Sequence, residues 1–214
     1  MTGKSLLLLG GGGHCRSVLD CILERETYER IGVVERERPA PAGPSATYVG
    51  TDEDLPALYA DGWTSAFITL GSVGDSRRRR ALYETVKSIG FELPAIISTT
   101  AIIGGNVEFE EGVFVGKRAV INIDTIVGTC AIINTAAILE HNCRVGAFAH
   151  ISPGSILCGG VTIEADAHIG AGSVVRQQLN VGRGALIGAG SVVVCDMAND
   201  VIAYGNPCRV ARIK

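Results

Sequence analysis

The sequence predicts two parts of different fold class: an α/β domain over residues 1–92, and a β-helix, a solenoid of short stacked strands, over residues 93–214. Two observations support this prediction. In the first part, apolar runs alternate with glycine turns and amphipathic helical stretches, which is the order of elements in a parallel α/β sheet. In the second part, an apolar residue recurs at every sixth position, a spacing that neither a helix nor an amphipathic strand produces.

The first part contains two strand–turn–helix stretches. "SLLLLGGGGHCRSVLDCILE" reads as a strand, a glycine turn and an amphipathic helix, and "IGVVERE" reads as a second strand. "SAFITLGSVGDSRRRRALYETVKSIGF" repeats the same plan, and the proline-rich "PAPAGPSA" before it reads as a loop that joins the two halves. Together these stretches predict a small parallel sheet covered by helices.

Two motifs of the first part allow more than one interpretation. The glycine turn "GGGGH" at residues 10–14 lies between a strand and a helix, where backbone N–H groups could bind a phosphate. A tight strand-to-helix turn needs glycine in any case, so the motif alone does not separate the two interpretations. Similarly, the arginine run at residues 77–80 could bind a diphosphate or form the solvated start of a helix.

The six-residue series of the second part runs from Ile97 to Val193 without an inserted loop, and every position in it is apolar. The residue four positions later is small in most repeats, with Leu179 as the large exception. Glycine often follows the apolar position directly, and we expect it to permit the bend between successive strands. Because units of this size cannot bury a face alone, they must stack, which predicts a solenoid.

Charge and cysteine content exclude several kinds of partner. The formal charge of −3 gives no electrostatic reason to expect nucleic acid or an anionic membrane surface. No run of eighteen apolar residues appears, so we expect no membrane span. The seven cysteines contain no C-x-x-C pair, which argues against a disulfide framework or a zinc knuckle and favours a cytoplasmic protein.

Two histidines, His141 and His150, lie nine residues apart in "AILEHNCRVGAFAHIS". Judged from the residues alone, a histidine in a solenoid is more often a surface residue than a reactive one. Positive charge gathers near the end of the sequence, on Arg176, Arg183, Arg209, Arg212 and Lys214. This cationic zone could bind a phosphorylated cofactor or provide a polar end for the solenoid.

The combination of parts resembles the bacterial surface-sugar acetyltransferases of the hexapeptide-repeat family. These enzymes join an N-terminal Rossmann-like α/β domain, which binds a nucleotide sugar, to a C-terminal left-handed parallel β-helix with three hexapeptide units per coil. Members acetylate UDP-bacillosamine-type amino sugars, GDP-perosamine, dTDP-viosamine or sialic acid hydroxyls, and they are homotrimers with active sites between subunits. The resemblance covers nearly the whole chain through the motifs "LGGGGHCRSVLD", "FITLGSVGDSRR", "IINTAAILEHNC", "AHISPGSILCGGV" and "SVVVCDMANDVIAYGNPCRV".

The resemblance implies acetyl-CoA as co-substrate and no metal. His141 matches the general base, His150 matches a histidine near the thioester carbonyl, and Gly159 matches a backbone N–H that receives the carbonyl oxygen. Members that act on nucleotide amino sugars typically carry Glu or Asp after the base. Asn142 stands there in this chain and supplies no charge, so we expect a somewhat weaker base. With eighteen residues per coil, His168 should stack on His150.

The resemblance also implies two sets of ligand contacts. Those for acetyl-CoA are Gly159, Gly160, Ala171, Arg176, Gly188, Ala189 and Arg209. Those for the nucleotide sugar or sialic acid are Gly10, Gly12, Gly13, His14, Glu35, Gly71, Ser72 and Arg77.

We therefore expect an acetyl-CoA-dependent acetyltransferase that modifies either the amine of a nucleotide-linked amino sugar or a hydroxyl of sialic acid. Transfer from a thioester needs a base, a donor for the oxyanion and a means of holding two substrates together. No Ser or Cys nucleophile with a triad is visible, so direct transfer in a ternary complex is expected.

Three other functions are compatible with parts of the sequence. A zinc-dependent hydratase of the γ-carbonic-anhydrase type shares the repeat but needs three convergent histidines, which spacings of nine and eighteen residues do not supply. A sugar nucleotidyltransferase would need a longer first domain. A non-catalytic scaffold that binds a nucleotide sugar would release no thiol from acetyl-CoA.

Overall fold

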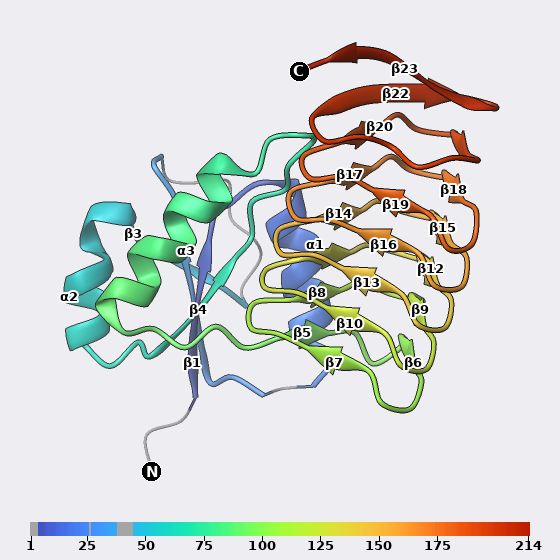
Figure 1. The fold of residues 1–214 in the computed structure, drawn as a ribbon. Coiled ribbons are helices and arrows are strands. Elements are labelled where there is room, and N and C mark those ends of the chain that lie inside the picture. Colours follow the sequence, from blue (N-terminus) through green and yellow to red (C-terminus); the bar gives the residue numbers. More distant parts are fainter. Residues whose placement is uncertain (1–3, 26, 38–44) are drawn as a thin grey trace. The chain divides into compact units, whose positions relative to one another are not determined.

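The computed structural model describes residues 4–25, 27–37 and 45–214 (Figure 1). Its contacts divide the chain into two compact units: Met1–Gly71 with Arg77–Ile96, and Ser72–Ser76 with Ile97–Lys214. The predicted fold class is confirmed, because the first unit is an α/β domain and the second is a β-helix. The loop expected over "PAPAGPSA" falls largely outside the described residues.

The first unit is built on a four-stranded parallel sheet in the order β3-β2-β1-β4. All residues of the central strand β1 are buried, as expected for a parallel strand with a neighbour on each side and both faces covered. The strands are β1 (Ser5–Leu9), β2 (Arg30–Val34), β3 (Thr47–Gly50) and β4 (Ser65–Ile68). The helices are α1 (Gly13–Ile22), the short 3₁₀ helix η1 (Asp52–Asp54), α2 (Leu55–Ala60) and α3 (Arg77–Ile89).

The second unit is a coil of two-residue strands that forms three parallel sheets, which we call its first, second and third faces (Figure 1). The first face contains β5 (Ile96–Ile97), β8 (Phe114–Val115), β11 (Ile132–Ile133), β14 (His150–Ile151), β17 (His168–Ile169) and β20 (Leu186–Ile187). The second contains β6 (Ile102–Ile103), β9 (Val120–Ile121), β12 (Ile138–Leu139), β15 (Ile156–Leu157), β18 (Val174–Val175) and β21 (Val192–Val193). The third contains β7 (Glu108–Phe109), β10 (Ile126–Val127), β13 (Arg144–Val145), β16 (Thr162–Ile163) and β19 (Asn180–Val181).

Each coil contains eighteen residues, because strands on one face pair in parallel with that register, as Ile133 does with Ile151. The second residue of each strand points inward, so the apolar series predicted from the sequence is the core of the β-helix. The series is buried from Val115 onward. Ile103 in the first coil is 38% exposed, because only one neighbouring coil covers it.

The sequence suggested that the glycine after each inward residue permits the bend at the corner. The structure shows that the bend comes from another position. Gly146, one such residue, lies outside the left-handed region, whereas the third residue after the inward position is left-handed at every corner from Asn106 to Gly190. A Cβ on Gly146 would lie 2.5 Å from the backbone nitrogen of Ala165 in the next coil. These glycines therefore permit close stacking of the coils, and the later residue makes the bend.

Two further segments belong to the second unit. The hairpin of β22 (Val201–Gly205) and β23 (Cys208–Ile213) is antiparallel and extends the first face beyond β20 (Figure 1). Residues 72–76, which we call the strap, follow β4 in the chain but contact the β-helix. The strap carbonyl of Ser72 accepts a hydrogen bond from Nδ1 of His150 at 2.9 Å. The carbonyl of Gly74 accepts one from Nζ of Lys214 at 2.7 Å.

Candidate active site

His141 lies at the corner between the second and third faces, two residues after the inward Leu139 that ends β12. The next residue, Asn142, takes the left-handed conformation of the corner, with φ of 59°. Asparagine is among the few non-glycine residues that adopt this conformation readily. The six-residue repeat thus fixes the position of His141 on an exposed turn of a rigid coil.

The neighbouring amide sets the tautomer of His141. Nδ1 of His141 lies 2.9 Å from Oδ1 of Asn142. Because an amide oxygen only accepts hydrogen bonds, Nδ1 carries the proton and Nε2 is left with its lone pair. This is the form that a general base requires, and it agrees with the role expected of Asn142.

Gly159 lies one coil further along the same corner, directly against the imidazole of His141. A Cβ on Gly159 would be 2.5 Å from Nε2 of His141 and 2.6 Å from its Cε1, so only glycine leaves room for the ring. The Gly159 N–H has no acceptor among the described residues, and its carbonyl accepts from Gln178. The N–H of Gly160 donates to the His141 carbonyl, so of these two glycines Gly159 supplies the open donor.

His150 begins β14 on the first face and is held at both ring nitrogens. Nδ1 lies 2.9 Å from the Ser72 carbonyl, and Nε2 lies 3.2 Å from Nδ2 of Asn134. The expected stacking with His168 is confirmed: the two residues pair in register, with ring centroids 4.9 Å apart and planes at 89°. Sequence reasoning did not select Asn134. This residue directly follows β11, at the corner between the first and second faces, in the coil that precedes the coil of His150.

The corner with His141 and the group around His150 lie on different sides of a single β-helix. His141 is at the junction of the second and third faces, whereas His150 is on the first face, which is opposite that junction. One chain therefore does not bring these two histidines together.

The residues expected to contact acetyl-CoA divide between the two edges of the second face. Gly159, Gly160 and Arg176 lie at its junction with the third face. Ala171, Gly188 and Ala189 lie at its junction with the first face, and Arg209 lies in β23. The N–H groups of Ala171 and Ala189 have no acceptor within the described part of the chain, whereas the N–H of Gly188 donates to Ala203.

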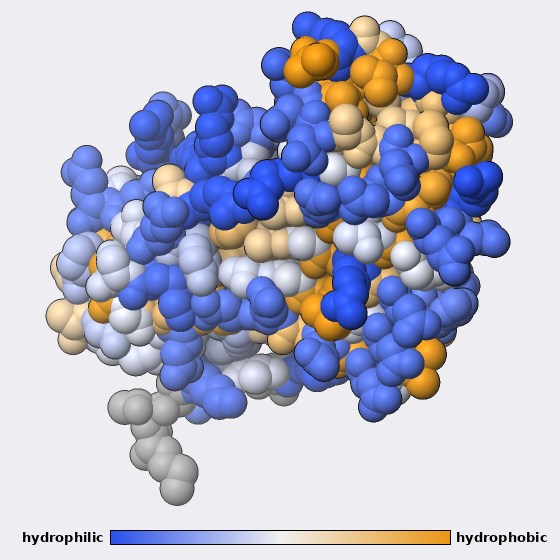
Figure 2. Space-filling view, in the orientation of Figure 1, coloured by the Kyte–Doolittle hydropathy of each residue, from blue (hydrophilic) through white to orange (hydrophobic). Residues whose placement is uncertain are grey.

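The second face carries a feature that sequence reasoning missed, a continuous apolar outer stripe. Its outward positions are all β-branched: Ile102, Val120, Ile138, Ile156, Val174 and Val192. Ile102 is 65% exposed and the others are half-buried in the single chain. Figure 2 shows apolar surface on the side of the β-helix where Figure 1 places β6. An apolar residue at every eighteenth position, directly before the inward one, was the signal in the sequence.

In the first unit, the predicted glycine turn follows the carboxyl end of β1, where open parallel sheets bind ligands. Gly10 has φ of 112°, and a Cβ there would clash with Leu70, so this position requires glycine. Positions 12 and 13 are open, with no atom within 4 Å of a Cβ at either. Gly71 lies beside His14, since a Cβ on Gly71 would be 3.6 Å from the Cβ of His14.

Glu35, which follows β2, is bound to this glycine turn. Its Oε2 accepts the N–H of Gly11 at 2.8 Å, and this hydrogen bond lowers the pKa of the carboxyl group below its ordinary value. Arg78 lies 3.9 Å away as an additional, weaker partner. In the arginine run, Arg77 and Arg78 are exposed, as either interpretation of the run expects, whereas Arg79 is buried.

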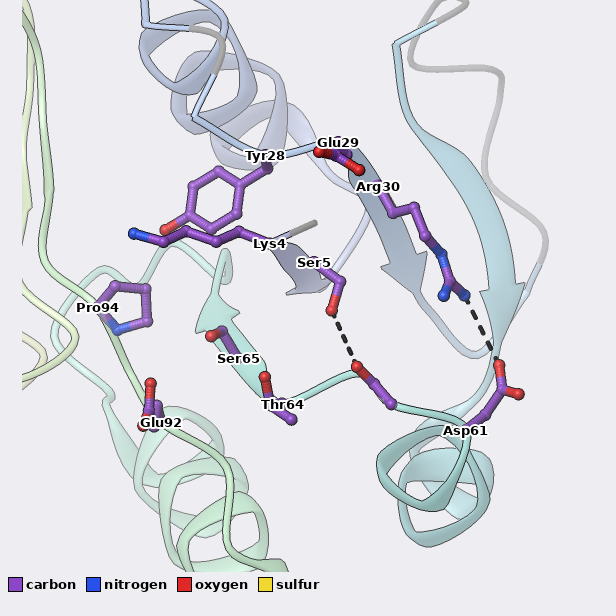
Figure 3. Close-up of a pocket in the computed structure, with 11 residues that line it drawn as sticks. Lys4, Ser5, Tyr28, Glu29, Arg30, Asp61, Thr64, Ser65, Glu92 and Pro94 are labelled. Carbon is purple, nitrogen blue, oxygen red and sulfur yellow. Dashed lines mark hydrogen bonds and ion pairs between the residues drawn. The ribbon is translucent and has the colours of Figure 1, made fainter. Parts of the chain in front are cut away.

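A cavity of about 580 Å³ lies elsewhere in the first unit, at the amino ends of β1, β2 and β4 (Figure 3). Arg30 spans one side of it, paired with Asp61 at 3.6 Å and lying 4.3 Å over the ring of Trp63. None of the residues predicted from the sequence lines this cavity. It lies at the end of the sheet opposite to the glycine turn, so it is not the expected nucleotide site.

No group of three or more His, Cys, Asp and Glu side chains in residues 4–25, 27–37 and 45–214 could hold a metal ion. Within the same ranges, none of the helices has the length and apolar character needed to cross a bilayer.

Two protein families match the chain. The family described as PglD N-terminal domain matches residues 5–86, and the bacterial transferase hexapeptide family (six repeats) matches residues 142–177. A sequence comparison with curated proteins gives no match.

Solved structures are similar over nearly the whole length. PerB from Caulobacter crescentus, in complex with CoA and GDP-perosamine, is 33% identical over 99% of both chains, with a TM-score of 0.91. The acetyltransferase domain of PglB from Neisseria gonorrhoeae, in complex with acetyl coenzyme A, is 31% identical over 97% of this chain and 99% of that one, with a TM-score of 0.91. WeeI from Acinetobacter baumannii shares the fold, at 23% identity and a TM-score of 0.86 over 97% and 99% of the two chains.

PerB and the PglB domain are each more than 30% identical to this chain over almost its full length. The two family matches fall on the α/β domain and on the hexapeptide repeat. The chain belongs to the bacterial hexapeptide-repeat sugar acetyltransferases that carry a PglD-type N-terminal domain.

Proposed function

We propose that this protein transfers the acetyl group of acetyl-CoA to the amine of a nucleotide-linked amino sugar, with His141 as the general base. The single observation that carries the proposal is the His141 corner, where a bare imidazole nitrogen faces a glycine with an open N–H. Similarity to PerB, which was solved with CoA and GDP-perosamine, supports the choice of both substrates.

The geometry of the corner fits direct acetyl transfer. The sugar amine attacks the thioester carbonyl carbon, Nε2 of His141 takes the proton from the attacking nitrogen, and the carbon–sulfur bond breaks to release CoA as the thiolate. The resulting imidazolium keeps its Nδ1–H on Asn142, which orients the ring but adds no negative charge. The open N–H of Gly159 is placed to receive the oxyanion that forms on the carbonyl oxygen.

An acyl-enzyme route through the neighbouring cysteine is disfavoured. Cys143 follows Asn142 in the corner but is fully buried, and burial raises the pKa of its thiol to about 11. A thiol with so high a pKa is protonated at neutral pH and is a poor nucleophile. Direct transfer between the two bound substrates therefore remains the better mechanism.

We further propose that the active protein is a homotrimer with its active sites between subunits. The apolar outer stripe of the second face supports this, because a stripe of this kind on a β-helix is suited to burial against another copy. The His141 corner borders one edge of the second face, and the Asn134 corner borders the other. Packing along this face in a closed ring would set the base of one subunit beside the His150 group of the next.

The α/β unit is assigned the nucleotide part of the acceptor. The glycine turn ends β1 at the edge of the sheet where such ligands bind, and positions 12 and 13 leave space for a close approach. We place the protein in the cytoplasm, because acetyl-CoA is available there and because none of the described cysteines forms a disulfide.

The resemblance also implies a second acceptor, a sialic acid hydroxyl, and Asn142 lacks the charge that is typical after the base in members that act on nucleotide amino sugars. A thiol-release assay with acetyl-CoA separates the two acceptors when it is run against a panel of nucleotide-linked amino sugars and free or CMP-linked sialic acids. We expect CoA release with an amino sugar and none in the His141→Ala variant. Release with sialic acids alone would move the acceptor to a hydroxyl, and no release with either class would contradict the proposed function.

A further inference from the structure

His168 is a buried histidine to which the proposed mechanism gives no role. It lies on the first face between His150 and Leu186, with which it pairs in register. The strap bonds to His150 through Ser72, and Gly74 lies against Leu186, since a Cβ on Gly74 would clash with Cδ1 of that leucine. The strap therefore passes over His168, which is only 6% exposed.

The surroundings of His168 favour a neutral, fixed ring. Nε2 lies 3.3 Å from Oγ of Ser152, whereas Nδ1 is buried without a partner among the described residues. With its proton on Nε2, His168 donates a hydrogen bond to Oγ of Ser152. Nδ1 then carries only a lone pair, and burying an unpaired lone pair costs less free energy than burying an unpaired N–H. Burial lowers the pKa of His168 to about 4.

The fixed ring of His168 meets His150 edge to face, with centroids 4.9 Å apart. His150 has its own acceptor in the Ser72 carbonyl, which requires a proton on Nδ1. Nε2 of His150 is then the acceptor for Nδ2 of Asn134 at 3.2 Å. Oδ1 of Asn134 accepts the N–H of Thr135 at 2.8 Å, so both ends of this amide are fixed and one N–H of Nδ2 remains for a ligand.

We propose that His168 is a positioning residue that holds the ring of His150 against the Ser72 carbonyl, so that His150 stays neutral with its proton on Nδ1 and Nε2 stays the acceptor for the Asn134 amide. His150 then orients the Nδ2 group of Asn134, a hydrogen-bond donor at the corner between the first and second faces. It does not itself donate a proton in acetyl transfer. The inference rests on the proposed function only in giving this group a place in acetyl transfer.

Imidazole ¹⁵N spectroscopy on the full-length protein tests the proposal directly, because the chain has only four histidines. Long-range ¹H–¹⁵N spectra report which ring nitrogen carries the proton, and His150→Gln and His168→Phe assign two of the four rings. In the unmodified protein we expect the Nδ1–H form for His150 and the Nε2–H form for His168. A charged His150, or one with its proton on Nε2, would overturn the proposal.

Two substitutions separate the effect of the aromatic ring of His168 from the effect of its nitrogen atoms. His168→Phe keeps an aromatic ring against His150 and should preserve the Nδ1–H form. His168→Leu fills the site without a ring and should shift the His150 signals toward a mixture of tautomers. If the leucine variant does not fold, His168→Met provides a second ring-free side chain of similar volume. A His150 spectrum unchanged without the ring would overturn the proposal.

Turnover measured on the same variants distinguishes this inference from the function on which it rests. We expect a loss of about tenfold, equivalent to about 1.4 kcal/mol, in kcat/KM for the ring-free variant and little loss for His168→Phe. A shifted tautomer with unchanged turnover would count against the place of His150 in acetyl transfer and would support its positioning by His168. Reduced turnover with an unshifted tautomer would overturn the positioning role.

Discussion

At the residue scale, the proposed role of His141 as general base depends on its two neighbours in space. Oδ1 of Asn142 accepts a hydrogen bond from Nδ1–H of His141, which orients the ring. Gly159 has no side chain, so Nε2 on the other side of the ring is unobstructed. Neither contact requires burial, which is why His141 can lie on an exposed turn and still have a defined tautomer.

Replacing His141 by alanine should lower turnover by about two to four orders of magnitude, as expected for the loss of a general base. Steady-state kinetics with acetyl-CoA and the acceptor, together with a thermal melt, measure the effect. Glu108→Ala, an exposed change on the third face, is the control and should leave the rate unchanged. Full activity in the His141 variant would place the base elsewhere.

Adding one methyl group at Gly159 should displace the imidazole of His141 without unfolding the coil. The new Cβ would lie 2.5 Å from Nε2, and the exposed ring can rotate away, so we expect a fall in kcat of about tenfold or more with little change in Tm. Gly105→Ala is the matched control: Gly105 lies three coils earlier at the same corner position, and its Cβ would meet only Ile123, at 3.9 Å. Equal rates in the two alanine variants would show that the space beside His141 is not needed.

At the scale of elements, the three faces of the β-helix carry different outer surfaces. Outward positions of the third face include Glu108, Arg144 and Asn180, which suit water, whereas the second face presents only Ile and Val. The two surfaces have the same backbone, so their difference lies wholly in the residue that precedes each inward position. This contrast supports the proposed burial of the second face, rather than the third, against another copy of the chain.

An aspartate in the middle of the apolar stripe should separate the subunits. Ile138→Asp would bury a charge in the proposed interface, so we expect a lower molar mass by size-exclusion chromatography with light scattering, and reduced activity with it. Thr162→Asp places the same charge outward on the third face and should leave the assembly intact. A native protein that is monomeric, or an Ile138→Asp variant that remains assembled, would contradict the proposed interface.

At the scale of the whole molecule, stability should fall on mild acidification because of His168. Burial holds its pKa near 4 in the folded chain, against an ordinary value of 6.5. As the pH falls below about 6.5, the unfolded chain takes up a proton that the folded chain refuses until about pH 4, and the difference favours unfolding. The full effect is about 3 kcal/mol.

Melting temperatures between pH 7.5 and 4.5 measure this effect. His168→Phe removes the titrating group and keeps a ring of similar size, so its Tm should depend less steeply on pH over this range. Carboxyl groups titrate in both proteins and cancel in the comparison. Parallel curves for the two proteins would show that His168 does not contribute to the acid sensitivity.

Much of the architecture follows from local patterns in the sequence. An apolar residue at every sixth position can be satisfied only by stacking short strands, so the β-helix core and its start near Ile97 could be read directly. The strand–glycine–helix order likewise indicated the parallel sheet around β1. Periodicity also placed His168 on His150, because residues eighteen apart share a face.

The origin of the bend was misread because sequence alone cannot separate two uses of glycine. Gly146 precedes the bend and was taken for its cause, yet it is the close approach of Ala165 in the next coil that excludes a side chain there. The left-handed corner positions also accept residues such as Asn142, so glycine content does not mark them.

By itself the sequence determined the repeat, the core and the candidate base, because each depends on residues that are neighbours along the chain or one coil apart. Only the tertiary structure decided which group contacts each ring nitrogen. The strap comes from a segment 78 positions away from His150, and the open side of His141 depends on the missing side chain of Gly159. Hydrogen-bond partners of this kind are fixed by how the coil closes in space, and no local pattern encodes them.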